Sequence, residues 1–150
     1  MKASRRGFTL LELLVVIALI GAVAGAFAWW MLGSVRRAEV RGAAYQLAGD
    51  LRQSRSQAQK TGLPQTVTVQ DETSGYTLTG GTGSARPRVL DKGVQVVEKT
   101  GGVSVTYRPP YGTLDASGVV WEVRSPANVP PLYVKVVGIT GKVMVSASRD

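Results

Sequence analysis

A long apolar run with a single acidic residue dominates the N-terminal part of the chain. Between Phe8 and Leu32, Glu12 is the only charged residue. About 25 helical residues, at roughly 1.5 Å each, exceed the ~30 Å hydrocarbon core of a bilayer. A charged carboxylate inside a membrane helix costs on the order of 3 kcal/mol, so a retained one needs a partner. Glu12 is therefore a candidate functional residue from its position alone.

Two ordinary interpretations of this N-terminus do not need Glu12. The first is a secretory signal peptide, in which Lys2, Arg5 and Arg6 form the basic region that precedes the apolar segment. Its cleavage sites would be the small-residue triplets Ala22-Val23-Ala24, Ala24-Gly25-Ala26 and Ala26-Phe27-Ala28. The second interpretation is a plain uncleaved membrane anchor.

A third interpretation rests on the motif Gly7-Phe8-Thr9-Leu10-Leu11-Glu12, which follows basic residues and leads into the apolar run. The motif resembles the class III signal of type IV pilins and type II secretion pseudopilins. The resemblance implies that a prepilin peptidase cleaves between Gly7 and Phe8 and methylates the new N-terminus at Phe8. It also implies that Glu12 meets the terminal amine of a neighbouring filament subunit, and an ion pair of this kind gains strength in hydrocarbon.

This resemblance predicts four segments. Residues 1–7 form a prepilin leader, 8–33 a transmembrane and assembly helix, 34–62 an amphipathic continuation of that helix, and 63–150 a β-rich periplasmic domain. Gly21 and Gly25 form a small-residue face on the apolar helix, which favours close helix packing during assembly. The implied location is the inner membrane with a single pass, and the implied filament is a periplasmic pseudopilus or a surface pilus.

Periodicity supports a long helix followed by strands. Apolar residues recur at helical spacing at Val40, Ala44, Leu47, Leu51 and Ala58. The sequence Thr61-Gly62-Leu63-Pro64 is typical of a helix stop.

Beyond this stop the period changes to two. The predicted strands are 66–70, 76–79, 94–99, 103–108, 119–123, 132–137 and 142–146. We predict an α+β fold in which the long N-terminal helix packs on a small antiparallel β-sheet domain, as in pilins.

Three less specific motifs narrow the resemblance from pilins in general to one branch. Leu47-Ala48-Gly49-Asp50-Leu51-Arg52, Tyr107-Arg108-Pro109-Pro110-Tyr111-Gly112 and Ile139-Thr140-Gly141-Lys142-Val143 are similar to the GspH/FimT branch of minor pilins and pseudopilins. This resemblance implies a structural subunit of a type II secretion pseudopilus or type IV pilus, near the filament tip. Its implied partners are the prepilin peptidase, other pilins or pseudopilins, and the inner membrane.

Composition limits the chemistry. The chain contains no Cys and no His, which excludes a disulfide, a Ser-His-Asp triad and a His-based zinc site. The glycine-rich segment from Gly80 to Gly83 matches neither a dinucleotide-binding motif nor a P-loop, so we interpret it as a hairpin loop. We therefore predict a protein that is not an enzyme and uses no metal or cofactor.

An alternative function is DNA capture during natural transformation, as the FimT side of the resemblance implies. The net charge is +8, and loss of the leader would leave 15 Lys and Arg against 10 Asp and Glu, or +5. Tyr133, Lys135 and Val137 alternate onto one face of a predicted strand. Lys135, Lys142 and Arg149 are the candidate DNA-binding residues of this terminal hairpin, beside an aromatic ring. Ordinary solvent-facing strand lysines remain the competing interpretation.

Overall fold

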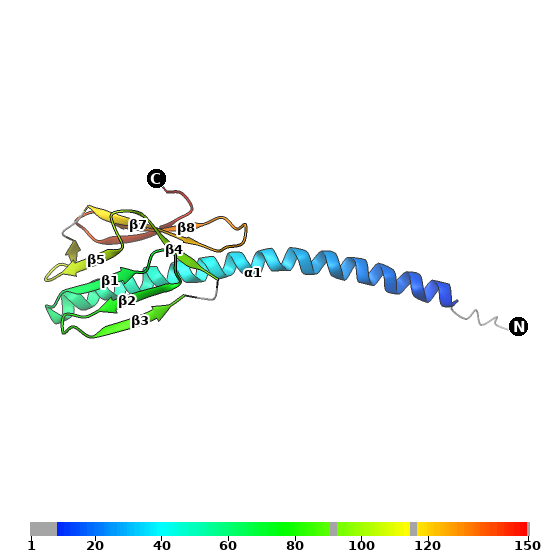
Figure 1. The fold of residues 1–150 in the computed structure, drawn as a ribbon, viewed down its shortest axis with the longest axis horizontal. Helices are drawn as coiled ribbons and strands as arrows, with labels where there is room; N and C mark the ends of the chain where they lie inside the picture. Colours follow the sequence, from blue (N-terminus) through cyan, green and yellow to red (C-terminus); the bar gives the residue numbers. More distant parts are fainter. Residues whose placement is uncertain (1–8, 91–92, 115–116, 150) are drawn as a thin grey trace, which may run out of the picture. The chain divides into compact units, whose positions relative to one another are not determined.

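A computed structural model describes residues 9–90, 93–114 and 117–149 (Figure 1). One helix, α1 (Leu10–Thr61), precedes nine β-strands. The chain divides into two compact units between Val35 and Arg36, so α1 contributes its first half to one unit and its second half to the other.

The first half of α1 is apolar and fully exposed. Every described residue up to Ala38 is exposed, including Leu14 at 58% and Trp29 at 84%. Among the described residues, α1 is the one helix long and apolar enough to cross a membrane, with a mean hydropathy of 2.6 in its most apolar window. The first half therefore has an apolar surface that nothing in its own unit covers.

The second half of α1 carries the predicted apolar stripe. All five predicted stripe residues are buried, and three further small side chains join them on the same face. The buried residues of α1 are Val40, Ala43, Ala44, Leu47, Ala48, Leu51, Ser54 and Ala58. The helix ends at Thr61, where Gly62 adopts a φ of +67° and its N–H donates to the carbonyl of Ala58 at 3.1 Å. This left-handed glycine is the C-terminal cap that the sequence predicts.

The strands form two antiparallel sheets rather than one. The first has the order β3-β2-β1-β5-β6 and the second the order β4-β7-β8-β9. The first sheet consists of β1 (Gln65–Val69), β2 (Gly75–Thr79), β3 (Ala85–Val89), β5 (Ser104–Arg108) and β6 (Thr113–Leu114). The second consists of β4 (Gln95–Thr100), β7 (Gly118–Arg124), β8 (Leu132–Val137) and β9 (Lys142–Ser146). Figure 1 shows β1, β2 and β3 beside the last turns of α1.

One hydrophobic core joins the α1 stripe to both sheets. Alternate residues of the strands point inward, as the burial of Val67 and Val69 in β1 and of Val134 and Val136 in β8 shows. Trp121 of β7 is fully buried, and its Nε1 donates to the carbonyl of Gly102 at 2.8 Å. A hydrogen bond therefore satisfies the one polar atom of this ring.

The predicted α+β fold, with a long helix on antiparallel strands, is confirmed. Seven strands lie at the predicted positions, shifted by no more than a residue or so at their ends. The prediction missed β3 and β6 and did not anticipate the division into two sheets. Residues 80–84 form the turn of the β2–β3 hairpin, closed by hydrogen bonds between Gly80 and Ser84 and between Gly83 and Gly80.

Candidate functional site

Thr9 caps the start of α1 and fixes the position of Glu12. The backbone N–H of Glu12 donates to the Thr9 carbonyl at 3.1 Å and to Thr9 Oγ1 at 3.2 Å. This is half of a capping box, in which a Thr three residues before a Glu satisfies a free N–H of the first turn. The Thr-x-x-Glu spacing in the sequence is the local signal for this cap. The predicted cleavage and methylation residues, Gly7 and Phe8, lie outside the described residues.

The Glu12 side chain lies on the exposed apolar half of the helix. Among the described residues, no Lys or Arg forms an ion pair with it. A charged carboxylate on a surface suited to lipid needs a cation from outside the described part of the chain.

Gly21 and Gly25 leave open space on the same half of α1. A Cβ built at either position meets no atom within 4 Å. Packing inside the chain therefore does not require glycine at these two sites, and a glycine inside a helix lowers helix stability relative to alanine.

The terminal hairpin places Lys135 and Lys142 on one face of its two strands, whereas Arg149 lies beyond them. In β8, Tyr133 and Lys135 are half-buried on the face opposite Val134 and Val136, as the alternation predicts. Lys135 pairs across the strands with Met144, whereas Lys142 pairs with Val137. Arg149 is exposed near the end of the chain.

Lys142 lies beside two arginines of α1. A hollow of about 440 Å³ between α1 and β9 is lined by Arg52, Arg55 and Lys142, together with Ser56, Gln59, Gly141 and Val143. Arg52 donates to the carbonyl of Val143 at 3.2 Å, and Arg55 Nε donates to that of Gly112 at 3.2 Å. These bonds hold the Arg52 guanidinium against β9 and the Arg55 guanidinium against the turn before β6, so three cations share one depression.

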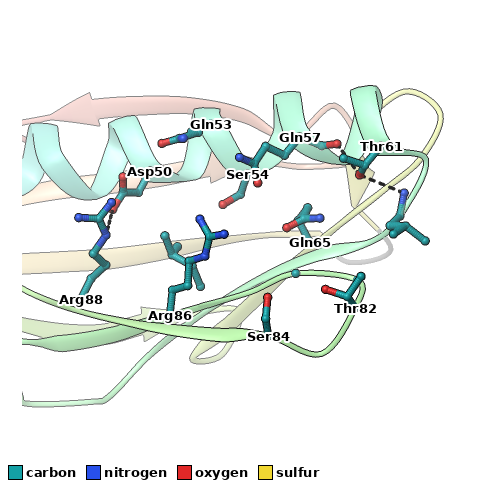
Figure 2. A pocket seen from close by; sticks show the side chains of 14 residues that line it. Asp50, Gln53, Ser54, Gln57, Thr61, Gln65, Thr82, Ser84, Arg86 and Arg88 are labelled. Carbon is teal, nitrogen blue, oxygen red and sulfur yellow. Dashed lines mark hydrogen bonds and ion pairs between the residues drawn. The ribbon is translucent and has the colours of Figure 1, made fainter.

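A second depression lies on the other side of the helix, between α1 and the β2–β3 hairpin (Figure 2). We call it the α1–β3 groove; its volume is about 180 Å³. Its lining residues are Asp50, Gln53, Ser54, Gln57, Thr61, Leu63, Gln65, Leu78, Gly80, Gly81, Thr82, Ser84, Arg86 and Arg88. The lining is mostly amide and hydroxyl side chains, with two arginines on the strand wall and one aspartate on the helix wall.

Comparisons with known proteins identify an N-terminal sequence motif and structures of the same fold. Residues 2–28 match the family model described as the prokaryotic N-terminal methylation motif. Two crystal structures of the type IV minor pilin FimU from Pseudomonas aeruginosa share the fold. One has a TM-score of 0.57 at 17% identity and covers 71% of this chain and 91% of FimU. The other has a TM-score of 0.61 at 18% identity and covers 73% and 90%. No curated protein sequence matches the chain.

The chain therefore carries the N-terminal methylation motif and has the fold of the two FimU structures. The matched motif includes Glu12. Among the described residues, no group of three His, Cys, Asp or Glu side chains could hold a metal ion.

A buried tyrosine bonds to Asp50, one of the residues that line the α1–β3 groove. Tyr76 of β2 donates its hydroxyl to Asp50 Oδ2 at 2.6 Å and accepts a hydrogen bond from Gln46 at 3.2 Å. Burial raises the pKa of the Tyr76 phenol above its ordinary value, and the bond to the Asp50 carboxylate adds to the increase. Burial likewise raises the pKa of Tyr107, while the Arg55 guanidinium opposes that shift. Both phenols therefore stay neutral at physiological pH.

Proposed function

We propose that this protein is a minor pilin or pseudopilin, a structural subunit of a type IV pilus or type II secretion pseudopilus that assembles through the first half of α1. Glu12 carries the proposal, because it is a single carboxylate on an exposed apolar helix and lies inside the matched methylation motif. The FimU structures are of a minor pilin, which supports a minor rather than a major subunit.

In the proposed mechanism the precursor sits in the inner membrane with a single pass, and the β domain faces the periplasm. Prepilin peptidase removes residues 1–7 and methylates Phe8. The Glu12 carboxylate then pairs with the Phe8 amine of an adjacent subunit, because two charges transferred together into an apolar bundle cost less than either alone. Gly21 and Gly25 let neighbouring helices approach closely.

Intact mass and N-terminal sequence of the protein, recovered from cells that express a prepilin peptidase, test the processing step. We expect an N-terminus at Phe8 with one added methyl group. The variant Gly7→Val should remain uncleaved. An N-terminus after Ala24, Ala26 or Ala28, or an intact Met1 in the unmodified chain, would contradict the proposal.

A second candidate function is DNA binding by the filament subunit. The hollow that brings Arg52, Arg55 and Lys142 together favours it, since adjacent cations bind phosphates by releasing counterions. Tyr111 is 73% exposed, and its carbonyl accepts a hydrogen bond from Gln59, which lines the hollow. An exposed ring next to cations is a stacking platform for a base.

Binding of a duplex oligonucleotide to the full-length protein in a zwitterionic detergent tests this second candidate. The affinity should fall steeply as salt rises, and Lys142→Ala should reduce the salt dependence by about one counterion. Lys135→Ala and Arg149→Ala test the remaining candidates. If all three variants bind like the unmodified protein, the hairpin plays no part, and if no binding occurs at low salt, the DNA function fails.

A further inference from the structure

The α1–β3 groove is polar because the helix covers only part of the first sheet. Strand register places Arg88 opposite Tyr76 and Arg86 opposite Leu78, so both arginines share the inward face of the hairpin. Tyr76 is buried under α1, whereas all of β3 is exposed. The inward face at the sheet edge therefore borders an open space beside the helix rather than the core. Figure 2 shows the Arg86 side chain extending from β3 toward α1, into the groove that Ser54 also lines.

Two deeply buried polar side chains point into this groove. Ser54 of α1 is 7% exposed and Gln65 of β1 is 9% exposed, and both line the depression (Figure 2). Among the described residues, neither side chain has a hydrogen-bond partner. Among the described residues, Tyr107 Oη is the one fully buried side-chain polar atom without a partner. The polar atoms of Ser54 and Gln65 therefore face the open space of the groove, where a group that enters it can bond to them.

The charges in the groove do not cancel. Asp50 Oδ2 accepts a hydrogen bond from the Tyr76 hydroxyl and lies 3.8 Å from Arg88 Nε. The negative charge of Asp50 therefore compensates the positive charge of Arg88. Arg86 forms no ion pair with any described residue. Two guanidinium groups and one carboxylate leave a net charge of +1 at the groove. A single negative charge with hydrogen-bond acceptors complements it.

The shape of the groove limits the size of its ligand. About 180 Å³ is below the 300–1,000 Å³ of usual small-molecule pockets. The described residues that line it include no aromatic ring, which disfavours a stacked base or sugar. At one end the β2–β3 turn closes over Leu63, since a Cβ on Gly81 would lie 2.4 Å from Leu63 Cβ. A short carboxylate side chain fits this volume and charge.

The edge of β3 does not favour strand addition. Pro87 in its centre lacks an N–H, and flanking arginines are residues that natural sheets use against edge pairing. A partner at this edge would therefore be held by side-chain contacts in the groove and not by a continued sheet.

We propose that the α1–β3 groove receives an Asp or Glu side chain of a neighbouring filament subunit, with Arg86 as the charge partner and Ser54 and Gln65 as hydrogen-bond partners. This proposal rests on the proposed function, because only an assembled subunit has such a neighbour. It assigns the β domain a specific contact besides the helix contacts at Glu12.

Photo-cross-linking in cells with the complete assembly machinery tests the contact. A benzophenone amino acid replaces Thr82, an exposed residue at the rim of the groove, in the full-length protein. We expect a cross-link to another filament subunit, at a peptide that contains an acidic residue. Arg86→Gln should lower the cross-link yield by about tenfold, as expected for loss of one charged hydrogen bond. The matched control is Arg41→Gln, which makes the same change at an exposed α1 residue outside the groove.

Ser54→Ala is the second variant, because it removes a hydroxyl that bonds to no described residue. It should fold normally and still lower the yield. Equal yields in Arg86→Gln, Ser54→Ala and the control would overturn the proposal, and so would a cross-linked peptide without an acidic residue. N-terminal mass and the amount of protein in sheared filaments are measured on the same cells. Normal processing and incorporation without the cross-link would reject the groove contact alone, whereas an unprocessed protein would reject the proposed function as well.

Discussion

The two halves of α1 have the same backbone and opposite surroundings. Leu14, in the first half, is 58% exposed, whereas Leu47, in the second half, is fully buried by the β domain. The second half finds its apolar partners within its own chain. The first half presents a continuous apolar surface, so its partners must be lipid or other helices. Substitutions in the second half should therefore change the stability of the β domain, and those in the first half should change the proposed assembly.

Leu47→Ala tests this comparison with the largest expected effect. Loss of a fully buried leucine should lower the free energy of unfolding of the β domain by about 2–5 kcal/mol. Leu14→Ala removes the same atoms from the exposed half and should change the free energy of unfolding by less than about 0.5 kcal/mol. Chemical denaturation of the full-length protein in detergent, followed by circular dichroism, measures both. Equal losses of stability would show that the first half also packs on the domain.

Glu12 comes next. Glu12→Val leaves an amine without its carboxylate in an apolar bundle, a cost of about 3 kcal/mol that should reduce filament incorporation by roughly a hundredfold. The unfolding of the β domain should be unchanged. Glu12→Gln separates charge from capping, because Gln also serves in a capping box with Thr9. Incorporation of the Gln variant at the unmodified level would rule out the ion pair.

Tyr76→Phe tests the attachment of β2 to the second half of α1. Loss of its hydrogen bond to the Asp50 carboxylate should lower the free energy of unfolding by about 1–3 kcal/mol at pH 7. Because the pKa of Tyr76 is raised in the folded state, the unfolded chain releases this proton first. The contribution is complete below pH 10 and is lost as the pH rises toward the folded-state pKa. Unfolding curves at several alkaline pH values should therefore show a smaller decline for Tyr76→Phe than for the unmodified protein.

Gly25 should give the smallest effect. Its Cβ would meet nothing within the chain, so Gly25→Ala should leave the domain intact and favour the helix by less than about 1 kcal/mol. Gly25→Leu should reduce incorporation about threefold if another helix approaches closely there. The amount of the subunit in sheared filaments is measured for the unmodified protein and for both variants. Equal amounts in all three would exclude Gly25 from the assembly surface.

Local patterns were sufficient for much of the fold. The α1 stripe and seven strands follow from periodicity, and Gly62 with Pro64 marks the helix end. β3 was missed because Arg86, Pro87 and Arg88 give it no buried face and low strand propensity. β6 spans only two residues, too few for a period. The assignment of strands to two sheets depends on pairings such as β1 with β5, which no local pattern records.

Some residues of the candidate sites are also predictable from local sequence, and others depend on the fold. Glu12 stands out in the sequence because one charge interrupts an apolar run. The α1–β3 groove could not be predicted, since it requires Ser54 and Arg86 to meet across a helix and a hairpin. Lys135 and Lys142 were predictable as neighbours on one hairpin, but the approach of Arg52 and Arg55 of α1 to Lys142 depends on the fold.

The path of the chain between its sheets also sets an order of events during synthesis. The hairpins β1–β2, β2–β3, β7–β8 and β8–β9 join neighbouring strands, but β4 pairs with β7 only after β5 and β6 have passed into the other sheet. Contacts between distant segments form slowly, because the intervening loop must close first. A chain that emerges N-terminus first therefore exposes the apolar stripe around Leu47 until β7 and its neighbours arrive. That stripe is the surface that a chaperone or a protease meets before the domain closes.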